Sequence, residues 1–149
     1  MGYIPLKRDD YVMCMLVWQS ETCINQTQAV ADCATRNSIG LMGIDSMAEF
    51  NYISNAAVGL ISKQNMSQTY TSLGFWIDGV RKATCKYPKT KSASCNGTNE
   101  FTYLDISAPN PVFQWLPGQP DGLSNDPPDS NCLYLKVSKT ENSGVDDMP

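Results

Sequence analysis

The chain has 149 residues, a formal net charge of -4 and a sequence pI near 4.6. Its length suggests one domain with a core large enough to fold alone, and we expect that domain to span residues 1–149, with an N-terminal extension at 1–10. The acidic balance excludes a general nucleic-acid binder, which needs a basic surface. No apolar run approaches the ~18–20 residues of a membrane-spanning helix, and no signal peptide is visible.

The absence of histidine narrows the possible chemistry. It removes the usual general base at neutral pH and every Ser-His-Asp or Cys-His arrangement. No carboxylate pair lies in a recognisable catalytic context. The six cysteines form no CxxC pair, which argues against a zinc site. We therefore expect a binding module and not an enzyme.

The first part of the chain predicts a strand and a helix. Residues 11–18 are rich in β-branched and aromatic residues, which indicates a buried strand. Thr27 can cap a helix that runs to about residue 37. One face of that helix carries, at helical spacing, Val30, Cys33 and Ala34.

A second helix is predicted from a capping pattern. Ser46 stands at the N-cap position, and Glu49 follows three residues later, as in a capping box. The helix that they open has a stripe of apolar residues on one side, which predicts core packing. The stripe consists of Phe50, Ile53, Ala57, Leu60 and Ile61.

Several short strands follow the helices. Residues 75–77 predict a buried strand that is closed by the Asp-Gly turn signal at 78–79, and further strands are predicted at 101–104 and 131–135. Residues 107–130 are dense in Pro, Gly, Asn and Asp and form a long loop, a kind of segment that tends to be functional. This order of elements predicts an α+β domain with mostly antiparallel pairing.

A basic run without any acidic residue lies between positions 81 and 91. Such a run could attract sulfated or sialylated glycans, but it is more typical of a solvated loop. Its members are Arg81, Lys82, Lys86, Lys89 and Lys91.

Three Asn-x-Ser/Thr sequons begin at Asn25, Asn65 and Asn96. Three sequons in a chain with six cysteines point toward N-glycosylation and an oxidising compartment. A cytosolic protein with six free thiols is the less favoured alternative. We therefore expect a secreted, extracellular glycoprotein.

Two groups of side-chain oxygens frame the region around the last predicted strand. Gln119 and Asp121 are held apart by one proline, and Asp146 and Asp147 are adjacent further along the chain. Together they look like oxygen ligands for a hard cation. In the alternative interpretation, Pro-Asp-Gly at 120–122 is only a turn, because it is a strong turn sequence, and the two aspartates are a solvated edge.

The chain resembles a C-type lectin-like domain over nearly its whole length. The family's motifs occur in the right order from about Cys14 to Pro149. The resemblance implies a fold in which two helices flank small antiparallel sheets and a long loop binds the ligand. The matching segments are Cys33, Leu41 to Ser46 with Glu49, Phe75 to Gly79, Phe113 to Asp121, Asn131 to Leu135, and Gly144 to Asp147.

The resemblance also implies disulfides. Cys14 and Cys23 are similar to the extra N-terminal pair of the family's long form. Cys85 and Cys95, which are close in sequence, are expected to pair with each other and to clamp the basic loop. Closing a loop of this size stabilises a fold by roughly 2–4 kcal/mol.

The two remaining cysteines match the family's framework positions. Cys132 should pair with a cysteine just after the Val-Asp-Asp segment, and Cys33 with one in a final strand, but neither partner precedes Pro149. We infer that the family's final strand and last two framework cysteines are missing from this sequence. The alternative is that Cys33 and Cys132 pair with each other or stay free.

The resemblance implies calcium as the cofactor. In the family the proline is in the cis form, which orients the side chains corresponding to Gln119 and Asp121 toward one ion. Ser130 stands where the family has a glutamate ligand, so Asp129 or Asp126 could reach the ion from the loop. The expected metal ligands are Gln119, Asp121, Asp146, Asp147 and Asp129.

The expected ligand is a carbohydrate or a glycoprotein. A sugar would complete the calcium shell with two vicinal hydroxyls, next to Gln119, Asp121 and Asp146. The Gln-Pro-Asp order is similar to the galactose-type version of the family, although residues 122–124 lack the aromatic of that version. The alternative is a calcium-independent lectin-like domain that binds a protein partner or acts as a structural extracellular module.

Overall fold

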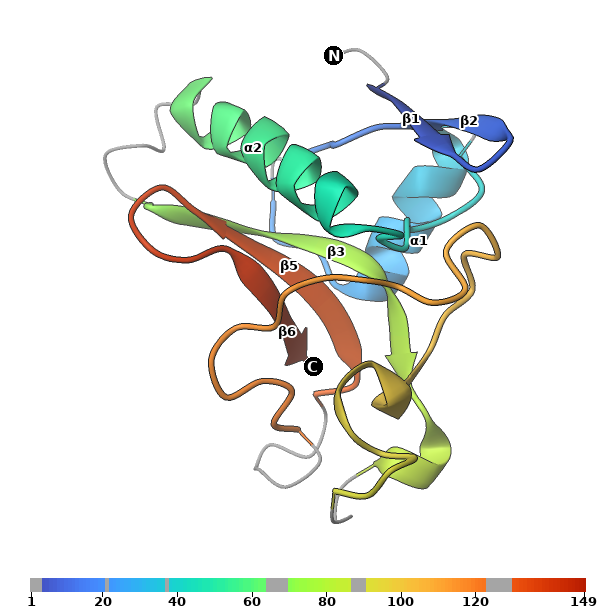
Figure 1. The fold of residues 1–149 in the computed structure, drawn as a ribbon. Helices are drawn as coiled ribbons and strands as arrows, with labels where there is room; N and C mark the ends of the chain where they lie inside the picture. The colour runs from blue at the N-terminus through green and yellow to red at the C-terminus, as the bar shows by residue number, and fades with distance from the viewer. Residues whose placement is uncertain (1–3, 21, 37, 64–69, 87–90, 123–129) are drawn as a thin grey trace.

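The computed structural model describes residues 4–20, 22–36, 38–63, 70–86, 91–122 and 130–149, and Figure 1 shows their arrangement. Its described elements comprise two helices and two small antiparallel sheets, which confirms the predicted α+β class. One sheet pairs β1 with β2, and the other has the strand order β4-β3-β5-β6. The elements are β1 (Ile4–Arg8), β2 (Tyr11–Met15), α1 (Gln26–Thr35), α2 (Met47–Lys63), β3 (Ser72–Arg81), β4 (Phe101–Thr102), β5 (Cys132–Ser138) and β6 (Gly144–Met148), with 3₁₀ turns η2 (Ala83–Cys85) and η3 (Gly97–Glu100).

The N-terminal extension forms part of the fold. Its strand β1 pairs with β2 in a hairpin, and Arg8 at the end of β1 is buried. The Arg8 guanidinium donates to both carboxylate oxygens of Glu49, at 2.8 and 2.9 Å, and to Asp105 at 3.2 Å. The predicted buried strand at 11–18 is too long, because β2 ends at Met15 and its first two residues are exposed.

The first helix begins earlier than predicted. Its N-cap is Asn25 and not Thr27, and Asn25 forms a reciprocal capping box with Gln28. The side chain of Gln26 is buried and donates to the carbonyls of Ile77 and Gly79 at 3.2 Å each. These bonds turn the Gln26 side of α1 toward β3.

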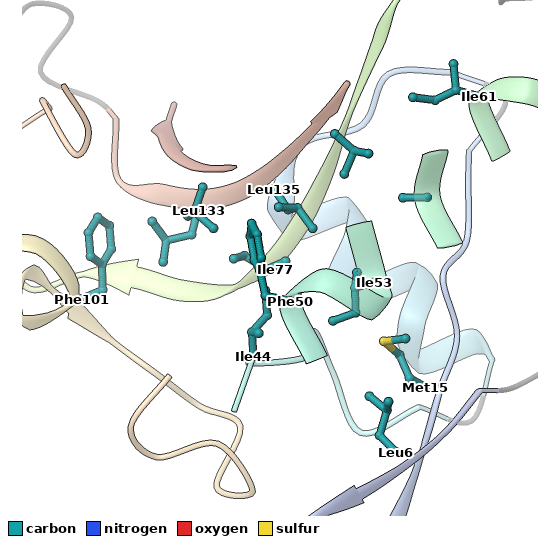
Figure 2. Packing of buried hydrophobic residues seen from close by; sticks show 13 residues of the cluster. Leu6, Met15, Ile44, Phe50, Ile53, Ile61, Ile77, Phe101, Leu133 and Leu135 are labelled. Carbon is teal, nitrogen blue, oxygen red and sulfur yellow. The ribbon is translucent and has the colours of Figure 1, made fainter. Parts of the chain in front are cut away.

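The second helix supplies one wall of the core. The Ser46 hydroxyl accepts the N–H of Glu49 at 3.2 Å, which confirms the predicted start. Most of the predicted stripe is buried, and α2 packs on β3 and β5, as Figure 2 shows. Within the described parts of the chain, neither helix is long and apolar enough to cross a membrane. The core contains Leu6, Met15, Ile44, Phe50, Ile53, Ala57, Ile61, Ile77, Phe101, Leu133, Leu135, Val137 and Val145.

The predicted turn at 78–79 is wrong, because β3 runs through it to Arg81. Gly79 has φ +141°, and the register of β3 against β5 shifts between Trp76 and Val80. A Cβ on Gly79 would lie 2.4 Å from a methyl carbon of Leu133, so only glycine fits here. The Asp-Gly pair therefore forms an irregularity within the strand and not the end of the strand.

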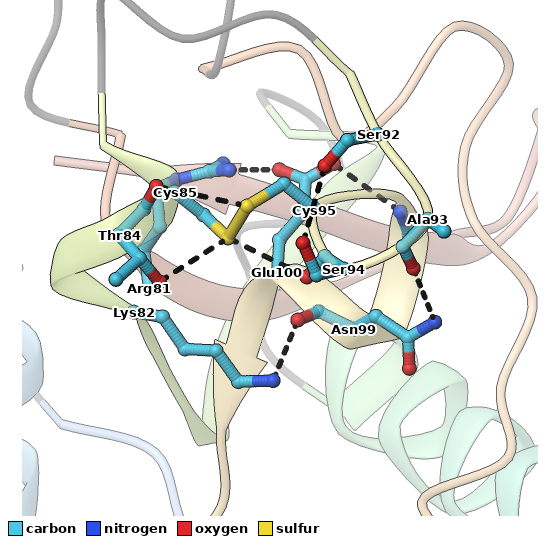
Figure 3. Close-up of a disulfide and its surroundings, with 11 residues drawn as sticks. Arg81, Lys82, Thr84, Cys85, Ser92, Ala93, Ser94, Cys95, Asn99 and Glu100 are labelled. Atoms are coloured by element: carbon cyan, nitrogen blue, oxygen red, sulfur yellow. Dashed lines mark hydrogen bonds and ion pairs between the residues drawn. A yellow bond between two sulfur atoms is a disulfide. The ribbon is translucent and has the colours of Figure 1, made fainter.

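One predicted disulfide is present. Cys85 and Cys95 are joined, with their Cα atoms 5.5 Å apart, and clamp the segment between η2 and η3 (Figure 3). Cys14 and Cys23 are both exposed and free in the structure, so it does not contain the predicted N-terminal pair. Cys14 lies next to the buried Met15 on β2, and the pleat of the strand directs it to the opposite side.

Cys33 and Cys132 are also free and are half-buried in α1 and β5. The alternative pair between these two framework cysteines is therefore not formed in the structure. Burial raises the pKa of both thiols.

Candidate functional site

The long loop docks beside β6. The N–H of Leu116 donates to the carbonyl of Val145 at 2.9 Å, and the N–H of Val145 donates to the carbonyl of Gln114 at 2.8 Å. The Trp115 ring packs on Phe113, with ring centroids 5.1 Å apart, and on the core. This docking brings the Gln119–Pro120 bond, which is cis, into the neighbourhood of the two aspartates of β6.

Asp147 joins the loop to the sheet. Its side chain is buried, and one carboxylate oxygen accepts the N–H of Asp121 at 2.9 Å. The other oxygen accepts the N–H of Gly122, also at 2.9 Å, and an N–H of the Arg81 guanidinium. Both oxygens of this carboxylate are therefore engaged by groups of the protein itself.

Arg81 is the centre of a buried ion-pair network. Its side chain is fully buried at the end of β3 and donates to the carboxylates of Glu100 and Asp147. A third N–H of the guanidinium donates to the backbone carbonyl of Ser130 at 3.0 Å. The guanidinium also lies over the ring of Phe101, 4.7 Å from its centroid. Figure 3 shows Arg81 and Glu100 facing each other beside the disulfide.

Asp146 has a different set of partners from its neighbour. It lies opposite Tyr134 in the pairing of β6 with β5, whereas Asp147 lies opposite the buried Leu133. Adjacent residues of a strand point to opposite faces of the sheet. One oxygen of Asp146 accepts the Tyr134 hydroxyl at 3.1 Å, and the other accepts the N–H of Asp147 at 2.8 Å.

The pKa values around Asp146 reflect burial and neighbouring charge. Burial raises the pKa of Asp146, and the charges of Asp147 and Asp121 raise it further. The bond from Tyr134 opposes this change. Burial and the charge of Asp146 together raise the pKa of Tyr134 to about 12. The effect of Asp121 on Asp146 places these two carboxylates near each other, at the junction of loop and sheet.

The side chain of Gln119 contains an amide oxygen that no donor among the described residues engages. Its amide oxygen is buried and has no hydrogen-bond partner among the described residues. Burying a carbonyl oxygen without a hydrogen bond is unfavourable. A hydroxyl, a water molecule or a cation that bound this oxygen would stabilise it. The structure thus brings Asp121 near Asp146, and Gln119 precedes Asp121 by two residues. The predicted ligand Asp129 lies outside the described residues.

The arrangement does not fit the predicted calcium cage. Calcium binds ~6–8 oxygens in one shell, whereas the Asp147 carboxylate is already bound to Arg81 and to two backbone amides. Asp146 is bonded to Tyr134 and lies on the other face of the strand. Among the residues that the structure describes, no three carboxylate, thiol or imidazole groups are placed to hold a metal ion. Calcium binding stays a prediction.

Three residues of this region are not among the site residues predicted from the sequence. Arg81 belongs to the basic run that is typical of a solvated loop, but it lies on the same side of the strand as the buried Ile77, and an arginine on the core side of a strand requires a buried partner. Glu100, which is fully buried, is that partner. Tyr134 alternates with Leu133 and Leu135 along β5, and this period of two could have placed it on the outer face next to Asp146.

Comparison with known proteins supports the predicted C-type lectin-like fold. Neither the search of curated proteins nor the search of solved structures gave a match. The family model described as C-type lectin domain-containing protein 141/158 matches residues 7–148, which is almost the whole chain. The matched range contains both helices, the whole four-stranded sheet, and the two-stranded sheet except for the first residues of β1. The chain therefore belongs to the C-type lectin domain-containing protein 141/158 family, and it is a C-type lectin-like domain.

Proposed function

We propose that this domain binds carbohydrate at the surface formed by Gln119, Asp121, Asp146 and Tyr134. The observation that carries the proposal is the half-buried pair of Tyr134 and Asp146, whose carboxylate also feels the charge of Asp121. Sugar hydroxyls are donors, and amide and carboxylate oxygens are the acceptors that suit them. Membership of a lectin-like family supports this ligand class.

Tyr134 adds a hydroxyl that can both donate and accept hydrogen bonds. Its hydroxyl donates to Asp146 and keeps lone pairs that can accept from a sugar. Its ring lies over Gly74 of β3, where a Cβ would come within 2.8 Å of a ring carbon. The absence of a side chain at position 74 therefore holds the tyrosine against the sheet, next to the carboxylates.

The proposed recognition does not require a metal ion. In the calcium-dependent version, which the sequence favours, Asp147 would be a ligand. That residue would have to leave the Arg81 guanidinium, to which it is bound inside the protein. The Asp146 carboxylate, whose oxygens keep lone pairs beyond the bonds from Tyr134 and from the N–H of Asp147, can instead bond directly to hydroxyl groups. Galactose-type specificity stays a prediction.

An extracellular location is part of the same proposal. The Cys85–Cys95 disulfide supports an oxidising compartment. Asn25 and Asn96 are exposed, as glycan acceptors must be, and Asn65 lies outside the described residues. The cap of α1 uses the side-chain oxygen of Asn25, which leaves its amide nitrogen for a glycan.

Retention on immobilised sugars tests the proposal. The full chain is passed over galactose and mannose columns, once with calcium and once with a chelator. We expect retention in both buffers, and loss of retention in Gln119→Ala and Asp146→Asn. Asp10→Asn is the matched control, because this aspartate is exposed on the β1–β2 hairpin, away from β6 in Figure 1.

The outcomes separate the alternatives. Failure to bind any glycan, on the columns and on a broader glycan array, would overturn the carbohydrate proposal and favour a protein partner. Equal retention of Asp146→Asn and wild type would show that a different surface carries the sugar. Retention only in calcium would support a sugar ligand and would show that binding requires the metal ion.

A further inference from the structure

We infer that Arg81 replaces a metal ion as the cation that ties Asp121 and Gly122, which follow Pro120, to the sheet, so that these two residues are held without calcium. The inference concerns how the loop is held. It does not depend on which ligand the domain binds.

The guanidinium of Arg81 is connected to the residues after Pro120 through one carboxylate. Arg81 donates to Asp147, and the carboxylate of Asp147 in turn accepts the N–H groups of Asp121 and Gly122. These two residues come directly after the cis Gln119–Pro120 bond. The chain of contacts therefore runs from the positive charge of Arg81 on β3, through Asp147 on β6, to the two residues after the cis bond.

Every charged group of this network already has a partner within the protein. All three guanidinium nitrogens of Arg81 have an acceptor, and the backbone N–H of Arg81 donates to the carbonyl of Asn131 at 2.8 Å. The side chains of Arg81, Glu100 and Asp147 are fully buried in their ion pairs. A buried charge that loses its partner is strongly unfavourable. A metal ion that bound Asp147 would remove this ion-pair partner from the buried Arg81, which is unfavourable.

Gly122 fits closely on the carboxylate of Asp147. A Cβ on Gly122 would lie 2.4 Å from an oxygen of Asp147 and 2.6 Å from the Cβ of Ser130. Ser130 is buried and carries no carboxylate, and its backbone carbonyl accepts a hydrogen bond from Arg81. Gly122 is thus packed directly on the arginine-bound carboxylate.

Residue-level hydrogen exchange tests the inference most directly. In the full chain with a chelator, we expect the amides of Asp121 and Gly122 to be protected, because both donate to Asp147. Adding calcium should leave their exchange unchanged. Rapid exchange in chelator that becomes slow with calcium would overturn the inference, because a metal would then be ordering the loop.

Thermal melting gives an independent readout. A calcium ion bound only to the native state at 100 times its dissociation constant would raise the Tm by roughly 5–10 °C for a domain of this size. We expect no shift between calcium and chelator. A rise of several degrees in calcium would contradict the assignment of Arg81 as the cation.

Two arginine variants separate a local role from a general one. Arg81→Lys keeps the charge but loses the fork of donors, so we expect the amides of Asp121 and Gly122 to lose protection while β3 and β5 keep theirs. Arg8→Lys is the matched control, because Arg8 is also buried between two carboxylates. If both variants deprotect the loop equally, Arg81 has no specific role there. This result stands apart from the sugar columns, so that either proposal can fail alone.

Discussion

The hydroxyl of Tyr134 donates to the carboxylate of Asp146 at 3.1 Å, across the paired strands β5 and β6. The pair couples a half-buried aromatic to a carboxylate whose pKa burial raises above its ordinary value. This pair is at the centre of the proposed sugar surface, and its protonation is therefore a test of that surface.

Carbohydrate retention should fall in mild acid. Because the pKa of Asp146 is raised, its carboxylate takes up a proton at a higher pH than an aspartate in an unfolded chain. The charged form, which accepts sugar hydroxyls, is present above the raised pKa and is lost as the pH falls through it. Retention measured against pH should show this loss, and Tyr134→Phe should move it to higher pH, because the Tyr134 bond lowers the pKa of Asp146.

The raised pKa of Asp146 has the opposite effect on stability, because lowering the pH relieves an unfavourable charge in the folded state. A raised carboxyl pKa means that charging Asp146 opposes folding above that pKa, and the opposition is relieved as the pH falls. Asp146→Asn should remove this contribution, so that its Tm relative to wild type is highest near neutral pH. A Tm difference that does not change with pH would contradict the buried, charged state of Asp146.

Gly122→Ala should destabilise the domain by about 1–3 kcal/mol, because an added Cβ overlaps Asp147 and Ser130. Gly59→Ala is the matched control, since Gly59 lies in α2 with nothing within 4 Å of its Cβ position. That change should stabilise the protein by roughly 0.5–1 kcal/mol through helix propensity. Urea unfolding measures both changes. Equal effects would show that the loop does not pack on Asp147.

Arg8→Met should destabilise the protein by about 3–5 kcal/mol, because it leaves Glu49 and Asp105 buried without their cation. Lys136→Met is a control at an exposed ion pair with Glu141, where we expect little change. Chemical denaturation of both variants checks the difference. A small effect at Arg8 would mean that the β1–β2 hairpin is not anchored to α2 through this side chain.

Thiol chemistry should separate the six cysteines into three classes, of which the disulfide-bonded Cys85 and Cys95 should not react at all. Cys14 and Cys23 are exposed and should react rapidly with a thiol reagent. Cys33 and Cys132 should react slowly, because burial raises their pKa and the thiolate is the nucleophile. Peptide mapping by mass spectrometry after labelling identifies each class. Finding Cys14 joined to Cys23 in the native protein would restore the pairing that the resemblance implied.

The Cys85–Cys95 disulfide should stabilise the fold modestly. The bond closes a short loop, with a sequence separation of 10, so its removal in the double variant Cys85→Ala and Cys95→Ala should cost about 2–3 kcal/mol. Replacing Cys14 and Cys23 by serine should leave the Tm unchanged, since these two are free. An unchanged Tm in the first variant would contradict the expected constraint.

Much of the fold follows from local patterns in the sequence. The stripe from Phe50 to Ile61 has helical spacing, and the strand around Leu133 and Leu135 alternates, so both elements and their buried faces are predictable. The start of α2 follows from Ser46 for the same reason, because a cap depends on residues three positions apart. The family resemblance depends on the order of such local motifs.

Two of the differences from the predictions, unlike the N-cap of α1, involve partners that are distant in sequence. The Asp-Gly signal at 78–79 has the residues of a turn, yet Leu133 and the amides of Leu104 and Asp105 hold it inside β3. The helix face of α1 is set by the bonds of Gln26 to β3, which the pattern of apolar residues does not contain. Such contacts exist only after the chain has folded.

The candidate site divides in the same way. Residue types and their order identify Gln119, Asp121, Asp146 and Asp147 as oxygen-bearing residues in the pattern of a lectin-like domain. Which of the two aspartates of β6 is bound inside the protein depends on the folded sheet. The pleat of β6 turns the two aspartates to opposite faces, and Arg81 engages one of them from β3, at a separation of 66 residues. A side chain so distant in sequence leaves no local pattern, and its charge acts on the site only through the packing of the sheet.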